Sequence, residues 1–119
     1  MKQIGLIISW FLLGIAAQAA VYTPTSLPNP KEVNRYDYVC NPDGIVGSSE
    51  VLALNRLARQ LEDSTEVELC VVAIESIGEM DAFDFCYELF QRWGIGKEGK
   101  NTGLLLFLAV ESRDIRIMT

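Results

Sequence analysis

The chain has 119 residues, about the size of one ordinary domain, and a formal net charge of −6 at pH 7. Half of the residues are apolar and 22% are charged, which predicts a globular fold and argues against a disordered tail. The acidic excess makes nucleic acid an unsuitable partner, because phosphate backbones bind basic surfaces. The sequence has no histidine, three cysteines and no C-x-x-C pair, which excludes a zinc site.

Residues 1–19 predict a signal peptide. Lys2 precedes an apolar run from Ile4 to Ala17, and Ala17 and Ala19 provide the small side chains that signal peptidase requires. The run is shorter than the ~20 residues of a spanning helix, which favours cleavage over an uncleaved anchor. We therefore expect an exported protein of the bacterial periplasm or cell envelope. Its mature chain would not span the membrane and would carry a charge of −7 once Lys2 is removed.

Residues 20–36 predict an extended linker, because its three prolines fix φ and disfavour helix at the residues before them. A short strand is expected at Tyr38 to Cys40, followed by a turn at Asn41-Pro42-Asp43-Gly44. Ser48 is then a suitable N-cap for a helix. Apolar side chains recur at helical spacing along that helix, which predicts that they share a buried face: Val51, Leu54, Leu57, Ala58 and Leu61.

Residues 103–110 are a continuous apolar run, and residues 67–74 are apolar except for Glu68, which is typical of central strands covered on both faces. Between them, Asp81 can start a second helix that ends at Gly94, with most of its aromatic side chains directed inward. Residues 114–119 alternate apolar and polar side chains and predict a final strand. The alternation of strands and helices predicts an α/β fold, a three-layer α/β/α sandwich with a mostly parallel central sheet and a terminal antiparallel hairpin.

Several segments together resemble one family, the TPM domain. They are the turn from Asn41 to Val46, the strand and loop from Val67 to Ser76, and three later segments: Trp93-Gly94-Ile95-Gly96, Gly99-Lys100-Asn101-Thr102-Gly103-Leu104-Leu105 and Arg116-Ile117. The resemblance covers roughly Val39 to the end and implies a TPM-like domain over residues 37–119. Because family members continue with a glycine-rich turn, an acidic loop and further helices, we expect this domain to be incomplete at its C-terminal end.

The family includes thylakoid-lumen proteins involved in photosystem II repair, a regulator of acetylcholine receptors in worms and many exported bacterial proteins. The resemblance therefore implies a non-catalytic accessory module that binds membrane-associated protein complexes, with a protein partner at the membrane surface. It also implies an alternative, a cation-dependent phosphatase-like hydrolase. The residues show no recognisable catalytic constellation, so whether the protein is an enzyme stays open.

The resemblance implies a calcium or other hard-cation site at Asn41, Asp43 and Asn101, which the family's pattern brings together at one end of the sheet. Family members commonly have aspartate where this chain has Asn41 and Asn101, so two negative charges are missing here. Calcium is thus the only cofactor implied. The alternative is that the three residues are turn formers, as their types favour.

Two further patterns have a structural and a functional interpretation. Gly94 to Gly99 matches the letters G-x-G-x-x-G, but it follows a helix and precedes a strand, so a connection is favoured over nucleotide binding. Cys40, Cys70 and Cys86 are expected to be buried thiols, with a Cys70–Cys86 disulfide as the alternative.

The signal-peptide assignment predicts that the mature protein begins at Ala20, because Ala17 and Ala19 fit the peptidase pockets. N-terminal sequencing of exported material tests this. A mature protein that retains Met1 would show that the segment is an anchor instead.

Overall fold

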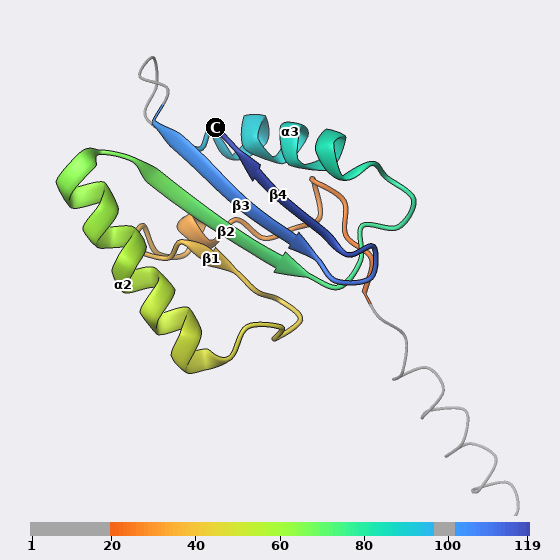
Figure 1. The fold of residues 1–119 in the computed structure, drawn as a ribbon, viewed down its shortest axis with the longest axis horizontal. Helices are drawn as coiled ribbons and strands as arrows, with labels where there is room; N and C mark the ends of the chain where they lie inside the picture. The colour runs from red at the N-terminus through yellow and green to blue at the C-terminus, as the bar shows by residue number, and fades with distance from the viewer. Residues whose placement is uncertain (1–19, 97–101) are drawn as a thin grey trace, which may run out of the picture.

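The computed structural model describes residues 20–96 and 102–119, so the predicted signal peptide lies outside the described residues. The described part contains one four-stranded sheet and two α-helices (Figure 1). Along the chain the elements are η1 (Pro30–Glu32), β1 (Val39–Cys40), α2 (Ser48–Thr65), β2 (Glu68–Ile74), α3 (Ala82–Trp93), β3 (Gly103–Ala109) and β4 (Asp114–Met118). No helix among the described residues has the length and apolar character needed to cross a membrane.

The strands lie in the order β1-β2-β3-β4, which confirms the predicted α/β fold. β1, β2 and β3 are parallel, and β4 pairs antiparallel with β3, which confirms the predicted terminal hairpin. β2 is central and buried from Cys70 to Ile74, because it is covered on both faces. α2 packs on β1 and β2, whereas α3 packs on β3 and β4 from the opposite face.

The main core lies between the sheet and α3. Side chains of alternate residues on β2 and β3 point to this face and meet one stripe of α3: Cys70, Val72, Ile74, Leu105, Phe107, Ala109, Ala82, Phe85, Cys86 and Leu89. Phe85 and Phe107 pack with ring centroids 5.3 Å apart. α3 begins where Asp81 accepts a hydrogen bond from the Asp84 amide, and it ends at Gly94, which has the left-handed φ of 58° that the sequence indicated.

Three helical predictions need correction. Gly47, not Ser48, is the N-cap of α2, because its carbonyl already accepts the first helical bond from the Val51 amide. Leu57 is 60% exposed although its spacing suggested burial. Phe83 and Tyr87 of α3 are 53% and 55% exposed, because the 3.6-residue period places them to one side of the buried stripe.

The segment expected to be a linker packs against the domain. The Tyr22 amide donates to the Ser76 carbonyl at 3.0 Å, and Val21 forms an isolated bridge to Ser76 beside the end of β2. Leu27 enters the main core, and the Cys40 thiol donates to the Pro28 carbonyl at 3.4 Å. Prolines exclude a long helix here, but they do not prevent a well-packed irregular segment.

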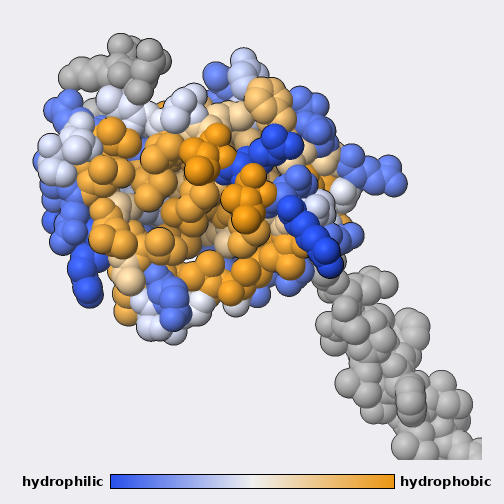
Figure 2. Space-filling model, in the orientation of Figure 1, coloured by the Kyte–Doolittle hydropathy of each residue, from blue (hydrophilic) through white to orange (hydrophobic). Residues whose placement is uncertain are grey.

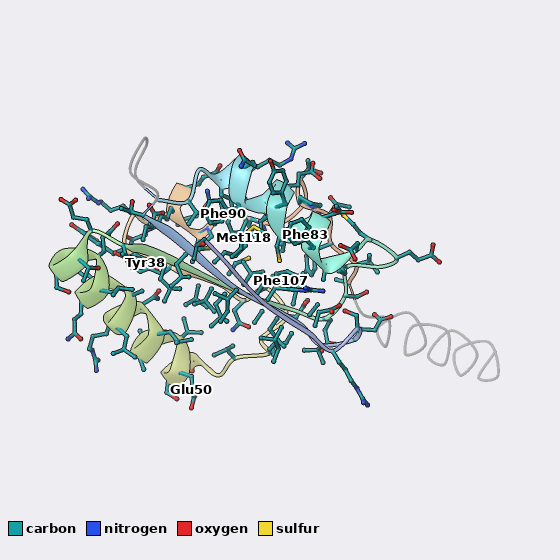
Figure 3. The ribbon with its side chains drawn as sticks, turned by 45° about the horizontal axis from the view of Figure 1, so that its top comes forward. Tyr38, Glu50, Phe83, Phe90, Phe107 and Met118 are labelled. Atoms are coloured by element: carbon teal, nitrogen blue, oxygen red, sulfur yellow. The ribbon has the colours of Figure 1, made fainter. Side chains whose placement is uncertain are left out.

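Tyr38, which directly precedes β1, contacts both α2 and η1 (Figure 3). Its buried hydroxyl donates to Glu62 Oε1 at 2.8 Å, and its amide donates to Asn55 Oδ1 at 2.8 Å, so both bonds attach it to α2. Lys31 of η1 places its Nζ 3.7 Å from the ring centroid. Burial, together with the bond to Glu62, raises the pKa of Tyr38.

Tyr38→Phe should lower the free energy of unfolding by about 1–3 kcal/mol, because it removes a hydrogen bond to a carboxylate and keeps the ring. Urea denaturation of the mature chain measures this change. Tyr36→Phe is the matched control, since Tyr36 is exposed and Phe keeps the ring beside Arg59, and it should stay within about 0.5 kcal/mol. Equal effects of the two substitutions would contradict the role given to Tyr38.

Candidate functional site

Asp43 lies in the loop after β1, next to the C-terminal end of β2. Its Oδ1 accepts a hydrogen bond from the Tyr22 hydroxyl at 2.9 Å, and its Oδ2 accepts one from the Glu75 amide at 2.9 Å. The carboxylate therefore joins the N-terminal segment, the β1 loop and the end of β2. Carboxylate-accepted bonds are among the stronger hydrogen bonds in proteins, so Asp43 has a clear structural role at this end of the sheet.

The Asn41 side chain forms two hydrogen bonds within the same loop. Its Oδ1 accepts from the Val46 amide at 3.0 Å, and its Nδ2 donates to the Val46 carbonyl at 2.7 Å. A side-chain amide can donate one hydrogen bond and accept another from the same backbone residue, whereas a carboxylate can only accept hydrogen bonds. Asparagine at this position thus suits the loop that the structure shows, as expected of a turn former.

Asn101, the third predicted ligand, lies outside the described residues, so the structure does not place it beside the other two. Among residues 20–96 and 102–119, no three acidic or cysteine side chains converge as metal ligands would. Asn41 and Asp43 share one loop, but their oxygens are directed to protein donors. Within the described part of the chain, Asn41 and Asp43 hold the loop together, and a calcium shell of six to eight oxygens would need further ligands.

Glu75 and Glu79 follow β2, at the end of the sheet where open α/β proteins tend to bind ligands. Both backbone polar groups of Glu75 form hydrogen bonds. Its amide donates to Asp43, and its carbonyl accepts from the Glu111 amide at 2.8 Å. Its side chain is half-buried, and Glu79 is exposed. No hydrogen bond within the described part of the chain orients either side chain toward a substrate, so they do not form a recognisable acid–base pair.

The three cysteines are buried free thiols, as expected, and they form no disulfide. Burial raises the pKa of Cys40, Cys70 and Cys86 from 9.0 to about 12. A thiol reacts as its thiolate, so at neutral pH these side chains are inert. The three thiols are therefore not candidate nucleophiles.

Gly96, in the glycine-rich segment after α3, allows close packing against the start of β3. Gly96 has a φ of 95°, and a side chain there would collide with the backbone of Gly103. A side chain at Gly103 would in turn collide with the Ile95 carbonyl. The two glycines thus allow the end of the α3 connection to pass close to the start of β3, while the rest of the G-x-G-x-x-G letters lie outside the described residues.

An apolar trough lies on the face of the sheet that carries α2. Among the described residues, α2 covers β1 and β2 only, and none of them covers the same face of β3 and β4 beside it. A hollow of about 250 Å³ marks the deepest part. We call this surface the α2-side trough and define it by Val46, Leu54, Leu57, Leu106, Leu108, Ile115 and Ile117.

Figure 2 shows the apolar side chains as a continuous surface over the strands. Ile115 and Ile117 are 70% and 71% exposed, and Leu57 extends the surface onto the flank of α2 that also carries Leu54. Large exposed apolar patches mark interaction sites in soluble domains. The sequence patterns did not locate this trough, although the apolar character of β3 on both faces was the signal for it.

Asp43→Asn should lower the free energy of unfolding by about 1–3 kcal/mol, because an amide cannot accept both bonds. The loss should be the same in EDTA and in millimolar calcium, as measured by thermal unfolding. Glu79→Gln is the control, an exposed acid at the same end of the sheet, and should change stability by less than about 0.5 kcal/mol. Calcium that stabilises the unmodified chain but not Asp43→Asn would instead identify Asp43 as a ligand.

Comparison with known proteins agrees with this architecture. The chain resembles the solution NMR structure of the N-terminal domain of a protein from P. gingivalis, with 33% sequence identity and a TM-score of 0.77. The alignment covers 84% of this chain and 64% of that one, so the chain spans slightly less than two-thirds of the solved domain. No curated protein matches the chain. A family model described as the TPM domain matches residues 39–119, and the chain therefore belongs to the TPM domain family.

Proposed function

We propose that this protein is an exported, non-catalytic module that binds a protein partner at the membrane surface through the α2-side trough. The observation that carries the proposal is the trough itself, a continuous apolar surface bordered by Leu57 on α2 and by Ile115 and Ile117 on β4. Water contact with such a surface is unfavourable, so covering it with a partner stabilises the complex.

The dimensions of the trough favour an amphipathic helix as the part of the partner that binds. Two neighbouring strands at about 4.8 Å spacing make a strip about 10 Å wide, which is the diameter of one helix with its side chains. α2 already lies along the sheet on this face and provides a lateral wall.

The chemistry of the described residues favours binding over catalysis. The three thiols are buried and protonated at neutral pH, and the sequence has no histidine to serve as a general base. Asp43 bonds to Tyr22 and to the Glu75 amide, which directs its oxygens toward the protein. The hydrolase alternative rests on the family resemblance, whereas the binding module rests on a surface of this chain.

Site-specific photocrosslinking in envelope preparations tests the proposal. A photoreactive amino acid in place of Leu57 should give a discrete adduct with one membrane-associated protein, because Leu57 is exposed on the trough side of α2. Leu52 is the matched control: it is also an exposed leucine of α2, 66% accessible, but lies two residues before Leu54 and therefore on the other side of the helix. The adduct should disappear when Leu106→Asp is added to the Leu57 probe.

The proposal fails if the Leu57 and Leu52 probes give the same adducts, or if neither gives any. Hydrolysis of a chromogenic phosphate ester separates the two functions. The purified chain should show no turnover above buffer, with or without calcium. Calcium-dependent turnover that is lost in Asp43→Asn would favour the hydrolase instead.

A further inference from the structure

We propose that two copies of this chain associate through the outer edge of β4, in antiparallel orientation, with Ile115 of one copy opposite Ile115 of the other. The interface is isologous, since each copy contributes the same strand and the same flank of α3. It lies at the open edge of the sheet and is distinct from the α2-side trough, which lies on one face.

Within residues 20–96 and 102–119, β4 is an edge strand of the sheet, and the backbone groups that pair with no described strand can be identified. The Val110 amide donates to the Ile74 carbonyl of β2 at 3.0 Å, so the even-numbered residues of β3 direct their backbone groups to β2. The odd-numbered residues Phe107 and Ala109 then face β4, where they pair with Arg116 and Asp114. The alternate residues Ile115 and Ile117 consequently direct their N–H and C=O groups outward, as a template for another strand.

Charge then selects the register of the second strand. With Ile115 opposite Ile115, Asp114 of each copy stands opposite Arg116 of the other, which gives two pairs of opposite charge related by the twofold axis. Centring the axis on Arg116 would instead place the two Arg116 side chains opposite each other. Neither Asp114 nor Arg116 belongs to a salt bridge among the described residues, so both are available for this pairing.

The exposed aromatic side chains of α3 lie on the flank that faces this edge. Arg92 borders a hollow shared with Pro24 and Leu27, which places its flank of α3 on the side of the N-terminal segment. Phe83 and Tyr87 lie to the other side of the buried stripe, beyond β4, and their rings stack with centroids 6.3 Å apart. Both side chains are more than half exposed.

Edge pairing would bring these aromatic pairs together. A continuous sheet places the two α3 helices on one face, side by side and antiparallel. Phe85 packs against Phe107, which pairs with Arg116 across the β3–β4 hairpin, and this sets the Phe83–Tyr87 turn of α3 level with the middle of β4. The same register that pairs the charges therefore centres the helix contact on Phe83 and Tyr87, and aromatic clusters of this kind favour dimer interfaces.

A charge-exchange experiment tests the interface by sedimentation over about 1 µM to 1 mM protein. The unmodified mature chain should form dimers. Asp114→Arg and Arg116→Asp should each weaken dimerisation roughly tenfold or more, because each places like charges opposite one another. An equimolar mixture of the two variants should dimerise again, since one copy then has two basic side chains at these positions and the other has two acidic ones. Circular dichroism checks that each variant is folded.

Association through the trough cannot produce this pattern, because mixing the variants would not restore it. A monomeric unmodified chain at 1 mM would overturn the proposal. So would single variants that dimerise like the unmodified chain, or a mixture that stays monomeric. Phe83→Ser with Tyr87→Ser should weaken the dimer without changing the response of the Leu57 photocrosslinking probe, so failure of this proposal and failure of the trough proposal can be distinguished.

Discussion

The need to cover both faces of a nearly all-apolar sheet governs the rest of this structure. β2 and β3 carry apolar side chains on each face, so each face requires a layer that excludes water. On the α3 side the cover is complete, because α3 and the N-terminal segment with Leu27 together exclude water. On the α2 side, the described part of the chain provides a single helix, which covers β1 and β2. The α2-side trough is the direct result of this imbalance.

The braced loop at the end of the sheet shows how a domain of this size positions irregular segments. Asp43 receives one bond from Tyr22 and one from the Glu75 amide, residues 21 and 32 positions away in the sequence. Asn41 meanwhile fixes the local turn through Val46. One residue thus sets the shape of the loop and the other attaches it to the domain. Two residues of the predicted ligand set thus also hold this loop in place.

The sequence predicted the elements that depend on local patterns and missed those that depend on distant partners. Residues 67–74 and 103–110 indicated the parallel strands, and Asp81 and Gly94 indicated both ends of α3, because burial runs and caps are local signals. Exposure of Leu57 was not predictable from spacing, since an amphipathic pattern shows which face is apolar but not what covers it. The partners of Asp43 and the packing of residues 20–36 involve contacts across the fold, for which a single sequence carries no signal.

The burial of all three thiols has a consequence for the order of events after synthesis. In the oxidising compartment that the N-terminal segment predicts, a disulfide forms only while a thiolate is accessible. Cys40, Cys70 and Cys86 are accessible in the unfolded chain and shielded in the folded one. Collapse of the core and attack by an oxidant therefore compete for the same sulfurs, and the outcome is decided by rates. A chain that folds first stays reduced, whereas a delayed chain can be trapped in a crosslinked form that cannot build this core.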